Sequence, residues 1–260
     1  MTQPIVISVI NHKGGVGKTT TTVNIAAGLA KLGKKVLVID LDTQMNLTHS
    51  LIGDVSDSEI TITEAILNEK ISLKSVIKRT GIENLDIVPS GESMVDLELK
   101  LHSAFGRESL LKRTLNNDHA KSYDFILVDN KPSIGLTTVN SLIASQYYLV
   151  PVSAEYLPMI GIKHLINTIE QIKPLNQSIM NLGYLLTMVD RRESISADVE
   201  KILRGTFESE VFDSVVRINT KLKATPQKRK SIFQVETAKG KGHADYLSVT
   251  KELLKRIERK

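Results

Sequence analysis

Residues 13–20 read KGGVGKTT, and glycine, lysine and threonine at this spacing are suited to holding phosphate groups. Closely spaced glycines let the backbone turn tightly and present its N–H groups to phosphate oxygens. The Lys18 ammonium can reach the β- and γ-phosphates of a nucleotide, and the Thr19 hydroxyl can ligate Mg²⁺. The predicted phosphate-binding residues are Gly14, Gly15, Val16, Gly17, Lys18, Thr19 and Thr20.

The segments on either side of this loop have the character that a phosphate loop requires. Residues 5–10 (IVISVI) form a continuous β-branched run, which predicts a strand buried on both faces. Residues 19–32 have helical character, and Gly33 is suited to ending that helix. A strand, a glycine-rich loop and a helix N-terminus together make an anion site. The sequence therefore predicts that residues 13–20 bind ATP together with Mg²⁺.

Acidic side chains end two further predicted strands. In VLVIDLDTQ (36–44), Asp40 ends an apolar run and Asp42 follows two residues later. The run FILVD ends at Asp129, the position of a Walker B carboxylate that holds the water shell of the metal. Ligands of doubly wound sheets bind outside the carboxyl ends of the strands, so these side chains are placed to face the nucleotide and its metal. The predicted metal site comprises Thr19, Asp40 and Asp129.

Strand-like apolar runs alternate with helical patterns along the whole chain. The predicted strands are residues 5–10, 36–40, 85–88, 125–129, 147–151, 182–189 and 211–216. The predicted helices are residues 19–32, 63–68, 94–101, 109–115, 160–172, 197–203 and 244–259. Repeated β–α units favour an α/β class with parallel strands. We expect a P-loop NTPase fold, a doubly wound and mostly parallel sheet with helices on both faces, in a single domain spanning residues 1–260.

The composition excludes several kinds of site. The chain has no Cys, which excludes disulfides, thiolate metal sites and Cys-held iron–sulfur clusters. Aromatic residues make up 4% with no Trp, which argues against stacking of unpaired bases. The N-terminus MTQPIVISVI lacks a signal-peptide pattern, and no apolar run has the length of a bilayer span. We expect a cytoplasmic protein.

Positive charge is concentrated in the last quarter of the chain. Residues 191–260 contain 17 Lys and Arg against 10 Asp and Glu, whereas the whole chain has a net charge of +5. Such asymmetry suggests a polyanion partner, and a solvated basic surface is the alternative. Phosphate contacts supply affinity for double-stranded DNA without reading its sequence. The predicted DNA contacts are Arg191, Arg192, Lys221, Lys223, Lys228, Arg229 and Lys230.

The loop KGGVGKTT, with its second lysine at Lys13, resembles the deviant Walker A loop of the ParA/MinD family of ATPases. The resemblance implies a homodimer with ATP at its interface, in which Lys13 stabilises phosphate charge in the partner subunit and Lys18 does so in its own. It also implies that Asp42 positions the attacking water and that Asp40 supports the Mg²⁺ shell. The catalytic residues are then Lys13, Lys18 and Asp42.

Two positions depart from the family pattern. Thr43 stands where the family usually has proline in VDxDPQ. The sequence Asp129-Asn130-Lys131-Pro132-Ser133 replaces the usual DTPPS. Lys131 adds a cation either near the nucleotide or on the dimer face, and the sequence leaves these two places open.

Further segments resemble the ParA/Soj branch of this family. Residues 150–162 (VPVSAEYLPMIGI) match a segment that implies a place for Glu155 near the dimer interface. Residues 187–196 and 216–226 match segments that grip DNA, with Arg192 and Lys221 at the matching positions. The branch implies a nucleoid-associated partition ATPase whose slow hydrolysis is stimulated by a ParB-like partner. The absence of a Ser/His/Asp constellation is consistent with slow hydrolysis that rests on positioning.

Two rival functions come from the same superfamily. A MinD-like regulator would lay its C-terminal helix on a membrane, and Leu247, Leu253, Leu254 and Ile257 could form one apolar stripe there. The stripe has no Phe or Trp anchor, so we do not expect a membrane partner; packing of residues 244–260 on the sheet would oppose it. The second rival, a metal-cofactor insertion or electron-transfer ATPase, is opposed by the absence of Cys.

Overall fold

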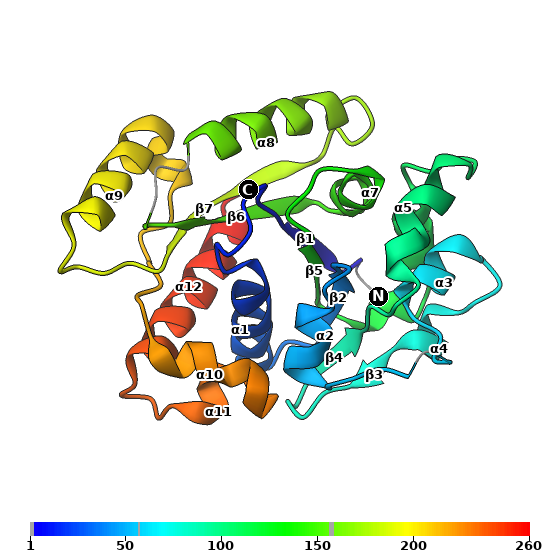
Figure 1. Cartoon of the computed structure of the whole chain (residues 1–260), viewed down its shortest axis with the longest axis horizontal. Coiled ribbons are helices and arrows are strands. Elements are labelled where there is room, and N and C mark those ends of the chain that lie inside the picture. Colours follow the sequence, from blue (N-terminus) through cyan, green and yellow to red (C-terminus); the bar gives the residue numbers. More distant parts are fainter. Residues whose placement is uncertain (1–2, 57, 156–158) are drawn as a thin grey trace.

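The computed structural model describes residues 3–56, 58–155 and 159–260, and these form an α/β fold around one twisted sheet (Figure 1). The strands are β1 (Ile5–Val9), β2 (Val36–Leu41), β3 (Lys78–Arg79), β4 (Leu85–Val88), β5 (Phe125–Asn130), β6 (Tyr147–Ser153) and β7 (Met180–Thr187). Within the described ranges the sheet has seven strands in the order β3-β4-β2-β5-β1-β6-β7. Only the β3–β4 pair is antiparallel. The predicted doubly wound, mostly parallel sheet is confirmed.

Helices cover both faces of this sheet. They are α1 (Lys18–Lys31), α2 (Asn46–Leu51), α3 (Ile62–Leu67), α4 (Leu73–Val76), α5 (Met94–His102), α6 (Leu110–Leu115), α7 (Leu136–Ala144), α8 (Met159–Ile172), α9 (Ser194–Phe207), α10 (Thr220–Lys228), α11 (Ile232–Val235) and α12 (Lys241–Glu258). Short 3₁₀ turns lie at Ala120–Ser122 and Glu208–Glu210. Helices α1, α2, α10, α11 and α12 share one apolar core, and the other helices pack on the opposite face (Figure 1).

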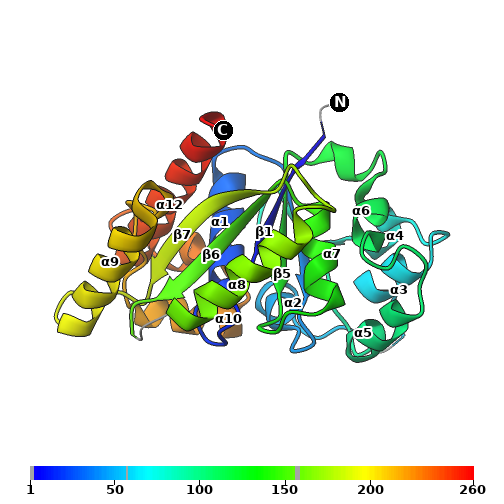
Figure 2. The same ribbon diagram turned by 90° about the horizontal axis from the view of Figure 1, so that it is seen from above.

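The period-two alternation of the strands decides which face each side chain joins. In β2, Val36 and Val38 enter the core beneath α1, while Leu37 and Ile39 enter the core beneath α3 and α5. The next residue on the α1 face is Asp40. By the same alternation, Asp129 at the end of β5 faces α1. The carboxyl ends of the strands therefore bring polar groups to one edge of the sheet, near α2 and α10 (Figure 2).

Helix α7 was missed by the sequence patterns. Its residues LTTVNSLIA include Thr137, Thr138 and Asn140, which have low intrinsic helix propensity. The helix is held instead by packing and by long-range hydrogen bonds. Asn140, for example, accepts a hydrogen bond from the Leu111 N–H and donates one to the Arg107 carbonyl. Propensity alone could not predict a helix whose stabilising partners are remote in sequence.

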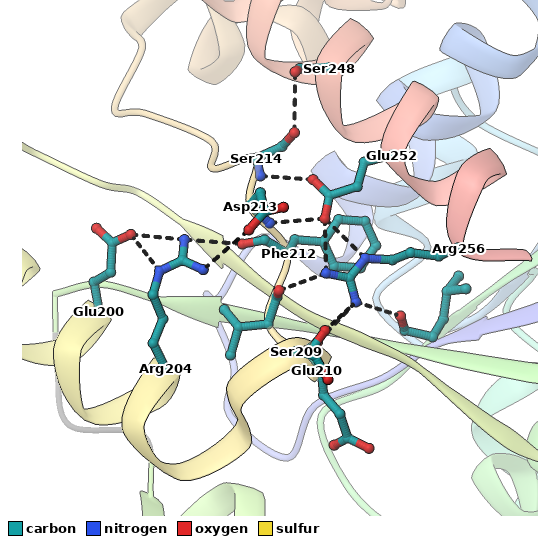
Figure 3. A network of polar contacts seen from close by, with 12 residues as sticks. Glu200, Arg204, Ser209, Glu210, Phe212, Asp213, Ser214, Ser248, Glu252 and Arg256 are labelled. Carbon is teal, nitrogen blue, oxygen red and sulfur yellow. Dashed lines mark hydrogen bonds and ion pairs between the residues drawn. The ribbon is translucent and has the colours of Figure 1, made fainter. Parts of the chain in front are cut away.

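The strand expected at residues 211–216 is wrong. This segment runs beside β7 and makes only isolated bridges to the sheet. The Phe212 and Val216 N–H groups donate to the carbonyls of β7 and hold the two ends of the segment. Between them, the N–H groups of Asp213 and Ser214 turn away and donate to Glu252 of α12 at 2.9 and 2.8 Å (Figure 3). The Glu252 carboxylate thus takes the N–H groups that a regular strand would donate to β7. Because Glu252 lies on a helix remote in sequence, no local pattern reveals this.

The C-terminal helix α12 packs firmly on α1 and on the edge of β7. Leu253 is fully buried, and Leu254 and Ile257 pack against the same core. Gly28 of α1 allows this close approach, because a β-carbon there would collide with the hydroxyl of Thr250. Three of the four residues of the predicted apolar stripe are therefore already used within the fold, and Leu247 is half-buried. Among the described residues, no helix combines the length and apolar character that crossing a bilayer demands.

Arg256 fastens α12 to the segment beside β7 (Figure 3). Its guanidinium donates to the carbonyls of Ser209 and Val211, lies 4.2 Å above the Phe212 ring and pairs with Glu252 at 2.9 Å. The side chains of Arg256 and Glu252 are only 14% and 15% exposed. Removing the arginine would leave the Glu252 carboxylate without its cation, although two backbone N–H groups still donate to it, and would take a donor from the carbonyls of Ser209 and Val211.

We expect Arg256→Ala to lower the free energy of unfolding by about 3 kcal/mol, the cost typical of removing one partner of a buried ion pair. The measurement is urea unfolding followed by circular dichroism. The control is Lys255→Ala, because the neighbouring Lys255 side chain is exposed and should change stability by less than about 0.5 kcal/mol. Equal stability of the two variants would show that Arg256 does not anchor the helix.

Candidate nucleotide site

The loop of residues 13–17 joins β1 to α1 and is shaped for an anion. Gly15 and Gly17 have φ of 75° and 83°, a left-handed backbone that favours glycine. Gly17 is also the N-cap of α1, so no side chain caps the first turn of that helix and no acidic residue lies in it. The N–H groups of this turn, with the partial positive charge of the helix end, are therefore oriented to receive phosphate oxygens.

Lys18 is buried beneath this loop, with 7% of its surface exposed. Its ammonium donates to the Lys13 carbonyl at 3.2 Å. Burial lowers the pKa of Lys18, while the negative charges of Asp129 and Asp42 oppose that shift. A buried ammonium at the phosphate loop can make charge-assisted hydrogen bonds to a phosphate that enters the cleft, and bound Mg²⁺ would offset the negative charge of the nearby carboxylates.

Asp40 and Asp129 lie directly opposite each other on neighbouring parallel strands, and both are fully buried. Asp129 accepts hydrogen bonds from the hydroxyls of Thr19 at 2.7 Å and Thr22 at 3.1 Å. Burial, and secondly the charge of Asp40, raise the pKa of Asp129 to about 7. Burial likewise raises the pKa of Asp40 to about 6. A site that disfavours two ionised carboxylates favours a bound cation.

Asp40 organises the segment that follows it. Its carboxylate accepts the N–H of Asp42 at 3.0 Å, and both the N–H and the hydroxyl of Thr48 at 2.9 and 2.7 Å. Asp42 is 6% exposed and lines the cleft, and its carboxylate accepts the Gln44 N–H at 3.0 Å. Asp40 thus fixes the backbone of Asp42, which lines the cleft beside the phosphate loop.

The residues present suit Mg²⁺ delivered with a nucleotide. Thr19 and Asp129 supply hard oxygen atoms at the base of the cleft. Among the described residues, no cluster of three or more His, Asp or Glu forms a metal cage. Mg²⁺ is usually bound through one or two protein oxygens together with phosphates and waters. Thr19 and Asp129 would hold the ion, which would neutralise phosphate charge when bound.

Two adjoining pockets lead away from the phosphate loop. The first has a volume of about 460 Å³ and is lined by the loop, Asp42, Asn46, Pro132 and Pro226. The second, of about 290 Å³, is lined by Thr20, Met188, Ile218 and Tyr246 among others. Both share Gly15, Gly17, Thr20 and Met188. Their combined shape suits phosphates at the loop and a nucleoside beyond it.

Sequence reasoning missed several residues that line these pockets. Met188, Ile218 and Pro226 lie in segments that the sequence assigned to DNA binding. His49 also lines the phosphate cleft, with its Nδ1 atom 3.1 Å from Asp54. The available signal was the position of Met188 near the end of the predicted strand 182–189, which the structure ends at Thr187 on the carboxyl edge of the sheet.

Lys13 has an exposed side chain at the mouth of the loop. Its N–H donates to the Asn11 side chain at 3.0 Å, which fixes the backbone of the loop entrance. Val16 is buried, and its carbonyl accepts the Thr187 hydroxyl at 2.9 Å. Glu155 lines the second pocket, whereas the neighbouring positions 156–158 of the predicted interface segment lie outside the described residues. The role of Lys13 across a dimer stays a prediction.

The predicted DNA contacts lie in two segments that tertiary structure brings together. A parallel bridge joins Val189 to Arg217, and the Ile218 N–H donates to the Val189 carbonyl at 3.1 Å. The turn carrying Arg191 and Arg192 and the start of α10 at Thr220 both follow immediately. Lys221, Lys223 and Lys228 are exposed on α10 or at its end.

The individual cations differ in their surroundings. The Arg192 guanidinium donates to the Asp190 carboxylate, with 2.5 Å between its Nη2 atom and Asp190 Oδ2. These hydrogen bonds lower the pKa of Asp190 to about 2. Arg229 has a left-handed backbone and places its guanidinium against Gly53. Lys230 lines the phosphate cleft. The basic stretch therefore extends from an exposed surface to the nucleotide site itself.

Comparisons with known proteins agree with this geometry. A family model described as an AAA domain matches residues 5–181. The sporulation initiation inhibitor protein Soj of Bacillus subtilis is 37% identical over 249 residues, covering 95% of this chain and 97% of that protein. The chromosome partitioning protein ParA of Myxococcus xanthus is 36% identical, covering 96% of this chain and 88% of that protein. The chain belongs to the Soj/ParA family of P-loop ATPases.

Solved structures place the same fold around nucleotides. A cobyrinic acid a,c-diamide synthase from Mycobacterium smegmatis with bound ATP analogue and magnesium has a TM-score of 0.85 and 29% identity, covering 98% of this chain and 96% of that one. The septum site-determining protein MinD of Pyrococcus horikoshii, complexed with Mg-ADP, has a TM-score of 0.76 at 21% identity, covering 96% of each chain. The second likeness concerns the fold alone. Membership of the Soj/ParA family agrees with the phosphate loop described above.

We expect Lys18→Ala to weaken ATP binding more than about a hundredfold, because a charged hydrogen bond contributes about 1.5–3 kcal/mol and Lys18 can make more than one to phosphates. The measurement is titration with a fluorescent ATP analogue in the presence of Mg²⁺. Lys31→Ala, at the exposed far end of α1, is the matched control and should leave affinity unchanged. Retained affinity in a folded Lys18→Ala variant would contradict the phosphate-loop assignment.

Proposed function

We propose that this chain is an ATP-dependent DNA-partition or positioning ATPase. ATP and Mg²⁺ assemble a homodimer with the nucleotides at its interface, and the dimer binds double-stranded DNA of the nucleoid without sequence preference. Hydrolysis is slow, and a ParB-like partner protein accelerates it and releases the DNA. The cycle segregates or positions a cargo, which is a plasmid, a chromosome origin or a protein assembly.

One observation carries this proposal: the basic segments extend directly from the nucleotide site. Thr187 hydrogen-bonds the Val16 carbonyl of the phosphate loop, and Met188 lines both pockets. Three and four residues after Met188 come Arg191 and Arg192 of the basic turn, which the Val189–Arg217 bridge holds beside the second basic segment. A nucleotide that fills the pockets therefore contacts the same backbone that presents the DNA-binding cations.

Dimerisation is supported by the exposed position of Lys13 at the mouth of the loop. A lysine there can reach a nucleotide held by a second copy, as the resemblance to the deviant Walker A loop implies. Two copies would also double the basic surface. Since DNA affinity rises steeply with the number of phosphate contacts, a dimer would bind far more tightly than a monomer.

Slow hydrolysis is supported by the character of the site. Asp42 lines the cleft. Asp129 accepts hydrogen bonds from threonine hydroxyls, and Asp40 accepts them from a threonine hydroxyl and a backbone N–H, so neither is a free base. Such a site accelerates phosphoryl transfer by placing water and charge, without a dedicated strong base. A partner protein that improves this placement would accelerate the reaction.

We expect Asp42→Ala to lower ATP hydrolysis by roughly a hundredfold, the usual cost of removing a group that stabilises or positions the reacting atoms. ATP-dependent dimerisation and DNA binding should persist, because Lys18, Thr19 and the basic segments remain. Phosphate release measures hydrolysis, light scattering measures dimerisation, and a gel shift of random-sequence duplex measures DNA binding. The exposed Asp198→Ala serves as control. Unchanged hydrolysis in the Asp42 variant would remove its catalytic role.

We expect Arg192→Glu combined with Lys221→Glu to abolish ATP-dependent DNA retention while leaving ATP affinity within about twofold. Each lost phosphate contact should reduce the slope of log affinity against log salt by about 0.9. The measurement is a salt series on random-sequence duplex, run beside anionic liposomes to test the membrane alternative.

The matched control for this pair is Lys74→Glu with Lys112→Glu. It makes the same change of net charge on α4 and α6, which cover the opposite face of the sheet from α10. Equal loss of DNA binding in the two double variants would point to net charge rather than to the basic surface. Undiminished ATP-dependent binding by the Arg192/Lys221 variant would contradict the proposed surface.

A further inference from the structure

The loop between β5 and α7, residues 131–135, begins two residues after Asp129 and borders the phosphate cleft through Pro132. Asn130 anchors its beginning on the far face of the sheet, donating to the Val9 carbonyl at 3.2 Å and to the Ser141 hydroxyl at 3.0 Å. The position of this loop relative to the phosphates therefore depends on what holds the residues after Asn130. The sequence left the place of Lys131 open.

Lys131 pairs with Glu98 on α5. Its Nζ atom lies 2.7 Å from the Glu98 Oε2 atom, and the two side chains are 17% and 29% exposed. The cation thus turns away from the nucleotide and toward a helix on the opposite face of the sheet. A partly buried pair of this kind is screened less by salt than a surface pair.

The same carboxylate holds the other end of the loop. Glu98 accepts hydrogen bonds from the Leu136 N–H and, at 2.6 Å, from the Thr137 hydroxyl. Gly135, the N-cap of α7, provides no side-chain cap, and a β-carbon there would collide with the Glu98 carboxylate. Glu98 therefore caps α7 from another helix. One side chain closes the loop from Lys131 to Thr137.

The hydrogen bonds to Glu98 favour its ionised form. Burial opposes the ionised form of Glu98, but the hydrogen bonds from Lys131, Thr137 and Leu136 outweigh it and lower the pKa of Glu98 to about 2. The carboxylate is therefore ionised at any pH at which the enzyme would work, and the pair does not act as a pH switch.

We propose that Glu98 and Lys131 are positioning residues for ATP hydrolysis, and that their ion pair fixes the loop of residues 131–135 against the phosphate cleft. Neither touches the reacting atoms. A loop displaced by about 1 Å beside a phosphoryl transfer can change its rate a hundredfold while leaving ground-state binding nearly intact. The proposal rests on the ATPase activity of the family and is independent of DNA binding.

The two residues differ in what their loss releases. Removing Lys131 frees only the first half of the loop, because Glu98 still caps α7. Removing Glu98 frees both halves. Lys131→Met keeps the length of the side chain and its apolar contacts while deleting the charge, and Lys131→Arg keeps the charge. Lys100→Met is the control. Lys100 lies on α5, the same helix as Glu98, and its partner Asp96 is 3.9 Å away on the exposed surface.

The experiment is a double-mutant cycle of Lys131→Met and Glu98→Gln, with kcat and KM for ATP measured without DNA or partner protein. Affinity for a non-hydrolysable ATP analogue and Tm are measured in parallel. We expect Lys131→Met to lower kcat at least fivefold while analogue affinity stays within twofold and Tm stays well above the assay temperature, so that the loss of kcat does not come from unfolding. Lys131→Arg should recover at least half of kcat. In the Glu98→Gln background, Lys131→Met should change kcat less than twofold.

Three results would overturn the proposal: unchanged kcat in Lys131→Met, a loss that is fully additive with Glu98→Gln, or a loss matched by equal weakening of analogue binding. If Glu98→Gln fails to fold, the Lys131→Met and Lys131→Arg comparison still decides. A wild-type chain without ATP hydrolysis would overturn this proposal and the ATPase function together. Loss of DNA binding in the Arg192/Lys221 variant has no bearing on it.

Discussion

Two carboxylates buried side by side, Asp40 on β2 and Asp129 on β5, set the main electrostatic constraint of this structure. They are register partners on adjacent parallel strands, about 4.8 Å apart in strand spacing, and both point to the α1 face. Two negative charges in that position are tolerated only with hydrogen-bond donors and cations nearby. Thr19, Thr22 and Thr48 supply the donors, and Lys18 supplies a cation. Mg²⁺ with a nucleotide would complete the neutralisation.

The helices around the site follow from this constraint. Helix α1 must begin at Lys18 to place Thr19 and Thr22 on Asp129, so the glycine loop before it has to turn within a few residues. The short helix α2 lies where Thr48 can satisfy Asp40, and this in turn holds Asp42 over the cleft. The carboxylates therefore organise the segments that a nucleotide later contacts.

Two sets of contacts connect the site to the rest of the molecule. On the α1 face, the Thr187 hydroxyl joins the phosphate loop to the end of β7, beyond which lie the basic segments. On the opposite face, Lys131 and Glu98 connect the loop after Asp129 to α5 and α7. Both sets of contacts begin at the carboxyl edge of the sheet, the first at the phosphate loop and the second two residues after Asp129.

Local pattern by itself predicted most of the elements and the phosphate loop with its strand-end carboxylates. The elements are the strands β1, β2, β4, β5, β6 and β7 and the helices α1, α3, α5, α6, α8, α9 and α12. Buried parallel strands are continuous apolar runs, amphipathic helices repeat their apolar residues, and the loop needs glycines at set positions. Only tertiary structure decided the rest. Helix α7 is held by hydrogen bonds to Glu98 and Arg107. The segment 211–216 does not form a strand because backbone N–H groups within it donate to Glu252. Lys131 pairs with Glu98 and points away from the nucleotide site. Each of these outcomes turns on a polar partner at least 30 residues away, and the pairing of charged groups across such separations leaves no periodic trace in the sequence.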